Sequence, residues 1–214
     1  MIYIEASADA PLGEVNRIDS YKATDFTPAD AILCRNTAPL IDQAYWLIGN
    51  HVGCKVLGRE IGYGLIVLIK KMKAVSIDEL EDRLTTYRDR EIAKYTSKGQ
   101  ETKAGAVADR VECVFHVINH LTEDKRTISA LIDSINSLFS DNGGARVTLA
   151  TVHKAKGLEW SKVWLLDSAK LMPSKYARQE WQKKQETNLQ YVAYTRAKSI
   201  LNFIDSKGRL EATE

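Results

Sequence analysis

The apolar residues of the chain fall into short runs typical of buried strands and longer stretches with helical spacing. Residues 31–34, Ala-Ile-Leu-Cys, are a short apolar run that predicts a buried strand. Thr37 follows this run and is suited to cap a helix. The apolar positions of that helix are Leu40, Ile41, Ala44, Leu47 and Ile48. A second strand is expected over residues 55–57. This order of strand, helix and strand within about 30 residues predicts a βαβ unit and a parallel sheet covered by helices.

The middle of the chain, from residue 64 to residue 139, is rich in charge and has few residues that break helices. Ser76, with Glu79 three residues later, predicts a capping box for a helix that ends near Ala93. Two more helices are indicated by apolar stripes, one at Val107, Val111, Val114, Ile118 and Leu121, the other at Ile128, Leu131, Ile132, Ile135 and Leu138. The sequence Asn-Gly-Gly at 142–144 ends the last of them. The block is therefore predicted to be an insertion of three or four helices.

The alternation of strands and helices resumes after this block. Strands are predicted over residues 146–151, 162–167 and 200–205, with a long helix between the last two. The register of that helix places Arg196 seven residues after Leu189, at the edge of its buried face. The stretch before residue 31 contains Ile2-Tyr3-Ile4 and the turn residues Pro11, Gly13 and Pro28, and is expected to add an edge strand and a loop. The predicted fold class is α/β, with one parallel-sheet domain (1–63 and 144–214) interrupted by a helical subdomain (64–143).

Composition limits the class of protein. With 44% hydrophobic and 27% charged residues the sequence is typical of a globular domain, and no apolar run approaches the roughly 20 residues of a membrane span. The sequence shows no secretion signal, and its three widely spaced cysteines do not indicate a disulfide framework. We therefore expect a cytoplasmic protein without a membrane partner. A net charge of +2 gives no overall basic field, so nucleic-acid binding has to be argued locally.

The segment at residues 147–160 has the layout of a site, because a polar loop joins two predicted strands. Ligands of open α/β sheets collect outside the carboxyl ends of the strands, where this loop is expected to bring together Thr151, His153, Lys154, Lys156 and Glu159. Gly157 allows a tight turn or a close approach of the backbone to a ligand. The alternative is an ordinary loop whose lysines and glutamate are simply solvated.

The same segment contains Thr-x-His-x-Ala-Lys-Gly-Leu-Glu-Trp, which resembles motif V of superfamily 1 helicases of the UvrD/Rep type. Residues 185–198 similarly resemble motif VI of these helicases, and residues 31–36 resemble the strand that enters their second motor domain. The resemblance covers residues 31–60 and 146–205, while the helical middle matches by position only. It implies a RecA-like second motor domain, of the P-loop NTPase type, with a small helical insertion.

The resemblance also implies roles for individual residues. Arg196 matches the arginine finger that reaches the γ-phosphate of ATP, and Glu159, beside Gly157, matches the glutamate that accepts a hydrogen bond from the ribose. Residues expected to contact single-stranded DNA, through phosphate or stacking, are Arg35, Asn36, Thr151 and His153. The segment 59–61, Arg-Glu-Ile, resembles the one that leads into the insertion, where its role could be only a structural ion pair.

Several family features are absent from the sequence. Thr187 and Asn188 stand where the family often has two basic residues. No Gly-x-x-x-x-Gly-Lys-Ser/Thr loop is present to hold phosphates, and no strand-ending acidic pair of the family type is found for Mg²⁺. ATP and Mg²⁺ would therefore be bound mainly by the first RecA-like motor domain of the same polypeptide, and this chain alone should be inactive. The alternative is a non-catalytic DNA-binding or protein-docking module that retains the helicase fold; a phosphate loop upstream would distinguish the two.

Two other clusters in the helical middle have ordinary interpretations. Cys113, His116 and His120 are spaced to share one side of a helix and are potential zinc ligands, but no second ligand cluster accompanies them. We interpret them as a partly solvated flank and expect no metal. The lysines and tyrosines at 87–98 could contact nucleic acid, but Asp89 and Glu91 dilute their charge, which favours a solvated face.

Overall fold

A parallel sheet forms the centre of the protein. The computed structural model describes residues 12–140 and 146–210. Within these residues six strands pair in parallel in the order β1-β6-β5-β2-β4-β3. Their bounds are β1 Glu14–Ile18, β2 Ala31–Cys34, β3 Cys54–Val56, β4 Val147–Thr151, β5 Trp160–Leu166 and β6 Ala197–Ile204. The predicted α/β, RecA-like fold is confirmed. The expected N-terminal edge strand is β1, whereas the triplet at residues 2–4 lies outside the described residues.

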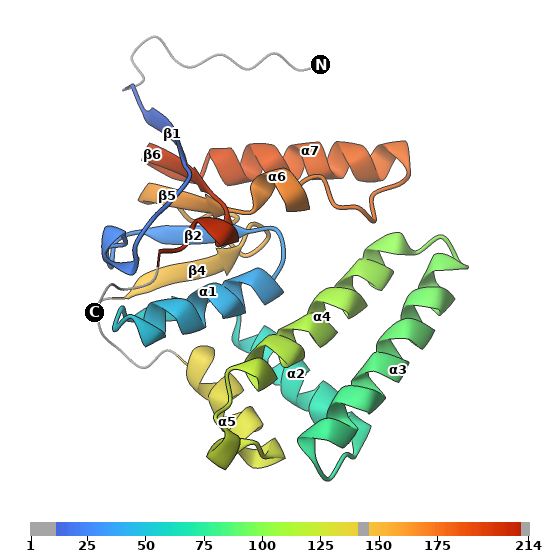
Figure 1. Ribbon diagram of the computed structural model, residues 1–214. Coiled ribbons are helices and arrows are strands. Elements are labelled where there is room, and N and C mark those ends of the chain that lie inside the picture. The colour runs from blue at the N-terminus through green and yellow to red at the C-terminus, as the bar shows by residue number, and fades with distance from the viewer. Residues whose placement is uncertain (1–11, 141–145, 211–214) are drawn as a thin grey trace.

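Helices cover both faces of the sheet (Figure 1). Their bounds are α1 Ala38–Gly49, α2 Arg59–Met72, α3 Ile77–Thr96, α4 Glu101–Asn119, α5 Ile128–Leu138, α6 Ser168–Leu171 and α7 Glu180–Tyr194. Helices α6 and α7 lie on one face, and α1 lies on the other. The strands alternate to match: Ile32 and Cys34 join the core beneath α1, while Ala31 and Leu33 join the core beneath α7. Residues of both faces are buried, as expected for a parallel sheet with two helical layers.

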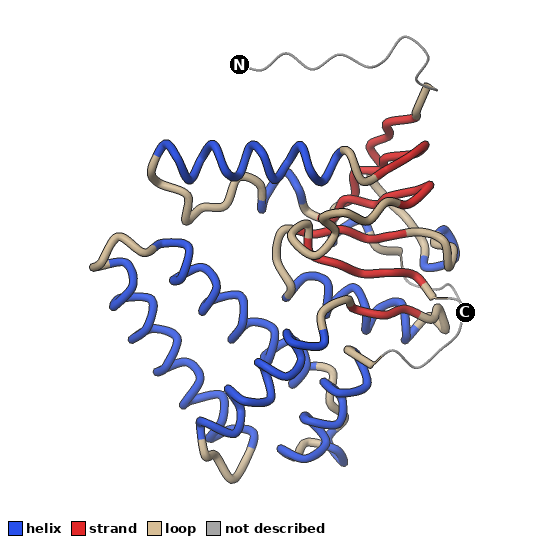
Figure 2. The backbone as a smooth tube through the Cα atoms, turned by 180° about the vertical axis from the view of Figure 1, so that it is seen from behind, coloured by secondary structure: helices blue, strands red, loops and turns tan. Residues whose placement is uncertain are grey.

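The helical block consists of α2, α3, α4 and α5, within the predicted number of helices. Helices α3 and α4 form a long hairpin that extends away from the sheet (Figure 2). Helix α2 begins at Arg59 and continues past residue 64, where the insertion was expected to start. Buried residues of the block, such as Leu84 and Leu131, belong to the same core cluster as Ile41 of α1. The block is therefore packed onto the sheet domain through a continuous apolar core. No helix of the described residues is long and apolar enough to cross a membrane.

The two predicted helix caps differ in outcome. The Ser76 hydroxyl accepts a hydrogen bond from the Glu79 N–H at 3.2 Å, as expected, while the Glu79 carboxylate accepts from the Val75 N–H at 2.7 Å instead of completing the reciprocal pair. Thr37 precedes α1, but its side chain makes no capping bond because its backbone is already helical, with φ −81° and ψ −37°. The prediction for the Thr37 side chain was wrong.

The amino end of α1 is instead capped by a side chain from α4. The Asp109 carboxylate accepts hydrogen bonds from the Thr37 and Ala38 N–H groups, each at 3.1 Å. A carboxylate at this position satisfies free N–H groups and interacts favourably with the positive end of the helix dipole. Asp109 therefore fixes the long hairpin against the helix that follows β2.

Asp109→Ala should lower the free energy of unfolding by about 1–2 kcal/mol, the usual cost of losing a capping side chain. Chemical denaturation followed by circular dichroism measures this change. Asp133→Ala, an exposed acid on α5, is the matched control and should change stability by less than about 0.5 kcal/mol. Equal effects of the two substitutions would contradict the capping role of Asp109.

Candidate nucleic-acid and nucleotide interface

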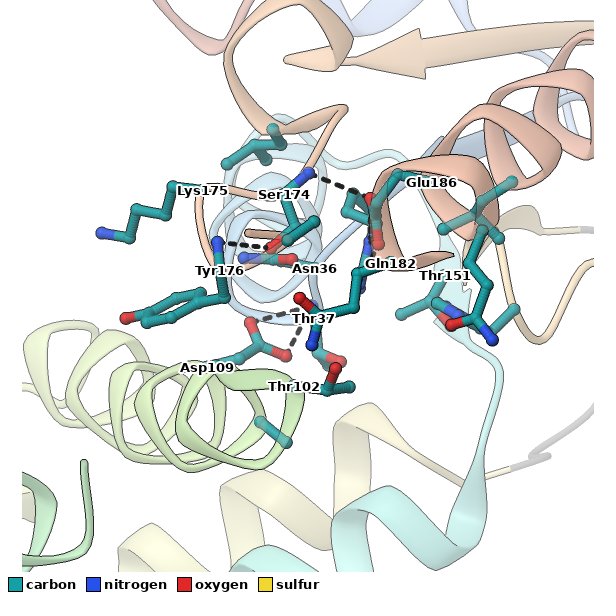
Figure 3. Close-up of a pocket in the computed structure, with 18 of the residues that line it drawn as sticks. Asn36, Thr37, Thr102, Asp109, Thr151, Ser174, Lys175, Tyr176, Gln182 and Glu186 are labelled. Atoms are coloured by element: carbon teal, nitrogen blue, oxygen red, sulfur yellow. Dashed lines mark hydrogen bonds and ion pairs between the residues drawn. The ribbon is translucent and has the colours of Figure 1, made fainter. Parts of the chain in front are cut away.

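A cavity of about 820 Å³ lies at the carboxyl ends of β2 and β4. The four residues predicted to contact DNA all line it, namely Arg35, Asn36, Thr151 and His153. Further lining residues come from α4, from the segment between α6 and α7, and from α7 itself, as Figure 3 shows. The structure thus brings together residues that are more than 100 positions apart in the sequence, at the edge where a parallel sheet places its ligands.

The helical block supplies one wall of the cavity. Tyr176, on the segment before α7, packs against α4 at Gly105, where an added Cβ would lie 2.8 Å from the Tyr176 ring. A glycine is therefore needed for this close approach. Thr102 and Asp109 of the same helix also line the cavity. The insertion is part of the site.

Arg35 is held in an ion pair with Glu186 of α7. The Arg35 Nη2 lies 2.8 Å from the Glu186 Oε1, and the Arg35 Nε donates to both carboxylate oxygens at 3.1 and 3.2 Å. The Glu186 Oε2 also accepts from the Ser174 N–H at 3.0 Å. Burial alone would raise the pKa of Glu186, but the hydrogen bond and charge of Arg35 outweigh it and lower that pKa. No role was predicted for Glu186; an acid three residues before Leu189, on the buried face, is the signal for such a partner.

Thr151 and His153 differ in what they can offer a ligand. Thr151 is buried, and its hydroxyl accepts a hydrogen bond from the Lys154 N–H at 3.3 Å, which orders the turn after β4. The His153 side chain is exposed at the cavity. The protein still removes part of the water around its ring, and this desolvation lowers the pKa of His153; the positive charges of Arg35 and Lys156 lower it further. Its ring is therefore neutral at pH 7 and better suited to stacking or hydrogen bonding than to charge pairing.

The cavity has an excess of basic side chains. Its lining includes Arg35, Lys156, Lys170 and Lys175, against the carboxylates of Asp109 and Glu186. Because Arg35 pairs with Glu186, and Lys170 pairs with Asp167 and Asp205, the excess comes from Lys156 and Lys175. This excess is local, since the whole chain carries a net charge of only +2. Asn188, at one of the positions where related helicases often carry a basic residue, lines the same cavity.

Two acids that follow neighbouring strands meet near Lys170. Asp205 follows β6 and lies 2.6 Å from the Lys170 Nζ, and Asp167 follows β5 and lies 3.5 Å from the same nitrogen. Asp167 also accepts hydrogen bonds from the N–H and hydroxyl of Ser206. Among the described residues no cluster of three or more histidine, cysteine or acidic side chains is arranged to hold a metal.

The residues predicted to contact the nucleotide form a second group. Gly157 and Glu159 directly precede β5, and Arg196 directly precedes β6. The two strand starts are adjacent, since the Trp160 N–H donates to the Arg196 carbonyl at 3.0 Å. Glu159 therefore lies at the amino ends of the strands, and the prediction that it joins His153 at the carboxyl ends was wrong. The loop between β4 and β5 crosses the sheet from the carboxyl end of β4 to the amino end of β5.

Arg196 lies after the helix, and its placement within α7 was also wrong. Helix α7 ends at Tyr194, because the chain must turn there to begin β6 at Ala197. The Arg196 guanidinium donates to the Val192 carbonyl, the Leu158 carbonyl and the Thr195 hydroxyl, each at 3.0 Å. These partners are neutral, so the bonds orient the guanidinium without cancelling its charge. Glu159, exposed nearby, lies 3.8 Å from the Lys198 Nζ.

Glu60 forms an ion pair with Lys154 of the loop after β4, so the segment 59–61 does contain a structural ion pair, as considered from the sequence.

The charged residues of α3 pair among themselves. Glu91 contacts both Arg90 and Lys94, each at 3.3 Å. These local contacts favour a solvated face for residues 87–98.

The three candidate zinc ligands of α4 do not converge. Cys113 is buried in the core, whereas the ring nitrogens of His116 and His120 lie 3.7 and 3.4 Å from Asp42 of α1. Arg209 binds the other oxygen of the Asp42 carboxylate. The hydrogen bonds of His116 and His120 hold the pKa of Asp42 well below its usual range, and Asp42 in turn raises the pKa of His116. This cluster is an ion-pair network that joins α1, α4 and the C-terminal segment.

The parallel sheet with helices on both faces is a RecA-like fold, with a helical block packed against it. The family model of the UvrD-like helicase C-terminal domain matches residues 67–208, about two thirds of the chain. This chain belongs to that family. A comparison with curated proteins gives no match.

The Asp42 network should make stability depend on pH. Because the pKa of His116 is raised in the folded state, its pair adds stability fully below the ordinary histidine pKa of about 6.5 and loses it as pH rises through the raised value. The negative charges of Asp42 and Glu112 favour protonation of His116, while the positive charge of Arg209 opposes it. His116→Gln should therefore lower the unfolding free energy by about 0.5–1 kcal/mol near pH 5.5 and by less near pH 8.5.

Thermal or chemical unfolding across this pH range measures the difference. Exposed His51 provides the control, and His51→Asn should change the unfolding free energy by less than about 0.5 kcal/mol. If the stability of His116→Gln followed the wild-type pH profile, the His116–Asp42 pair would not be the source of the pH dependence.

Proposed function

We propose that this chain is the second motor domain of an ATP-dependent DNA helicase or translocase that moves along single-stranded DNA. In this proposal it supplies an arginine finger and part of the strand-binding channel, and is inactive without the phosphate-loop domain of the same polypeptide. The observation that carries the proposal is the loop between β4 and β5. Its start lines a basic cavity at one edge of the sheet, and its end lies beside Arg196 at the other edge.

The geometry around Arg196 fits a nucleotide phosphate. The guanidinium is oriented by three neutral oxygen atoms, so its full positive charge is available to an anion. In the proposed enzyme ATP, with Mg²⁺ held mainly by the first motor domain, supplies the phosphoryl group whose transfer drives movement. Arg196 would stabilise the charge on that group, and Glu159 would accept a hydrogen bond from the ribose. Gly157, with φ +80°, would allow the turn that leads into Glu159.

The cavity fits a single strand. A surplus of basic side chains suits a phosphate backbone, and the neutral His153 ring can stack on a base. Asn36 and Thr151 line the same surface and offer polar contacts to sugar or phosphate. Because α4 and the Tyr176 segment form the opposite wall, the helical insertion would help to enclose the strand.

The loop offers a physical connection between the two proposed contacts. Val152 and Ala155 are buried under α7, and the Arg196 side chain holds the Leu158 carbonyl. A shift of the nucleotide side of this loop would therefore act on the segment that carries His153. Closure of the two motor domains around ATP and reopening after hydrolysis would move the strand.

In the protein that joins this domain to its phosphate-loop domain, Arg196→Ala should lower kcat for ATP hydrolysis by about 10³ or more, the usual range for an arginine finger. The affinity for DNA should hardly change, since Arg196 lies at the opposite edge of the sheet from the cavity. Arg196→Lys should restore little activity, because a lysine lacks the planar fork of donors. Steady-state ATPase assays with saturating single-stranded DNA measure these effects.

Thermal unfolding of each variant must accompany the assays, because truncation also removes three hydrogen bonds. Arg178→Ala, at an exposed arginine just before α7, is the matched control and should retain activity. If folded Arg196→Ala kept near-normal DNA-stimulated turnover, Arg196 would be only a structural residue. The chain would then fit a non-catalytic DNA-binding or docking module better.

A further inference from the structure

We propose that Glu186 is a built-in competitor for the DNA phosphate that Arg35 would bind. In this arrangement a strand gains the Nε and Nη2 donors of Arg35 only by displacing the Glu186 carboxylate. The inference rests on the proposed function and deepens it, because it concerns how the strand-binding cavity is regulated. It makes Glu186 a positioning residue whose effect on DNA acts through Arg35.

The Glu186 carboxylate occupies a ready-made anion site. It receives the fork of Arg35 through Nε and Nη2, and it receives the Ser174 N–H from the opposite side. Figure 3 shows the hydrogen bond between Ser174 and Glu186 at the edge of the cavity. A guanidinium fork and a backbone N–H are also donors that bind phosphate oxygens in proteins. An incoming phosphate would therefore find both donors already in place, with a carboxylate between them.

The pair lies where a strand can reach it. The Arg35 and Glu186 side chains are 18% and 9% exposed, and both line the cavity. A DNA phosphate can replace the Glu186 carboxylate at the Arg35 and Ser174 donors without a large loss of stability. The net contribution of a largely buried ion pair is small, because desolvation of both charges offsets most of their attraction. A DNA phosphodiester carries one negative charge, as the carboxylate does, but neighbouring phosphates of the strand would also gain Lys156 and Lys175, which line the same cavity.

The Arg35–Glu186 pair has a consequence for affinity. While Glu186 is in place, the Nε and Nη2 donors of Arg35 are occupied. The strand is then held by Lys156, Lys175 and the polar groups of the cavity. The free chain should therefore bind a strand weakly and reversibly, as a motor that must release DNA at each step requires. Removing the Glu186 charge should convert this weak contact into a stronger one.

The test is a double-mutant cycle on the folded chain, with binding of a fluorescent oligothymidylate followed by anisotropy at several salt concentrations. Glu186→Gln should increase affinity roughly tenfold near 50 mM salt and steepen the slope of log K against log salt by about 0.7, the value for one more phosphate contact on a single strand. Arg35→Gln alone should lower affinity, because it removes a cation and leaves the Glu186 carboxylate unpaired in the cavity. In the double variant, Arg35→Gln should abolish the gain caused by Glu186→Gln.

The matched control is Glu180→Gln, which removes the same charge from an exposed position on the same helix. It should raise affinity by less than about twofold, since exposed charges are largely screened. Circular dichroism and thermal unfolding of each variant confirm that the fold is retained. Glutamine keeps an oxygen that can accept from the Ser174 N–H, so the cavity wall is preserved.

The outcomes separate the inference from the proposed function. The competition is overturned if Glu186→Gln leaves DNA affinity unchanged, or if it raises affinity equally with and without Arg35. Either result leaves the proposed DNA contact intact. Binding by Glu186→Gln but none by the wild type would support the competition and count against DNA binding by the unmodified domain. Absence of binding by every variant contradicts both.

Discussion

The parallel arrangement of β4, β2 and β5 is the constraint on which the site depends. Strands β4 and β5 flank β2 and run in the same direction, yet only the eight residues 152–159 connect them. A parallel connection has to return the chain from the carboxyl end of one strand to the amino end of the next. The loop therefore crosses the sheet beneath α7, with Val152 and Ala155 buried. A single short segment in this way links the basic cavity to the neighbourhood of Arg196.

Features that depend on local sequence were predictable. The apolar run at 31–34, the helical stripes of α4 and α5 and the Ser76 cap are all encoded by residues a few positions apart, and the structure confirms them. The error for Arg196 is also local in origin. Helical spacing continues through residue 196, but the chain must leave the helix at Tyr194 to pair β6 with β5. Pairing between distant strands decided the helix end, and periodicity could not reveal it.

The parts of the site that escaped prediction are contacts between distant segments. Asp109 caps a helix 71 positions away, and Glu186 pairs with Arg35 across 151 positions. Both are acids on helices, where a sequence offers no sign of the partner. Similarly, Cys113 was expected on a solvated flank but lies in the core, because α4 is covered by neighbouring helices on more than one side. The family resemblance selected the candidate residues, whereas the structure shows which of them already have partners.

In the proposed enzyme this domain holds one half of an ATP site, and the phosphate-loop domain holds the other half. Steady-state ATP hydrolysis by the purified chain, with and without saturating single-stranded DNA, tests this proposal most directly when compared with the protein that also carries the phosphate-loop domain. We expect no appreciable turnover by the chain alone and DNA-stimulated turnover by the joined protein, because the sequence contains no Gly-x-x-x-x-Gly-Lys-Ser/Thr loop. Robust turnover by the chain alone in a pure sample would contradict it.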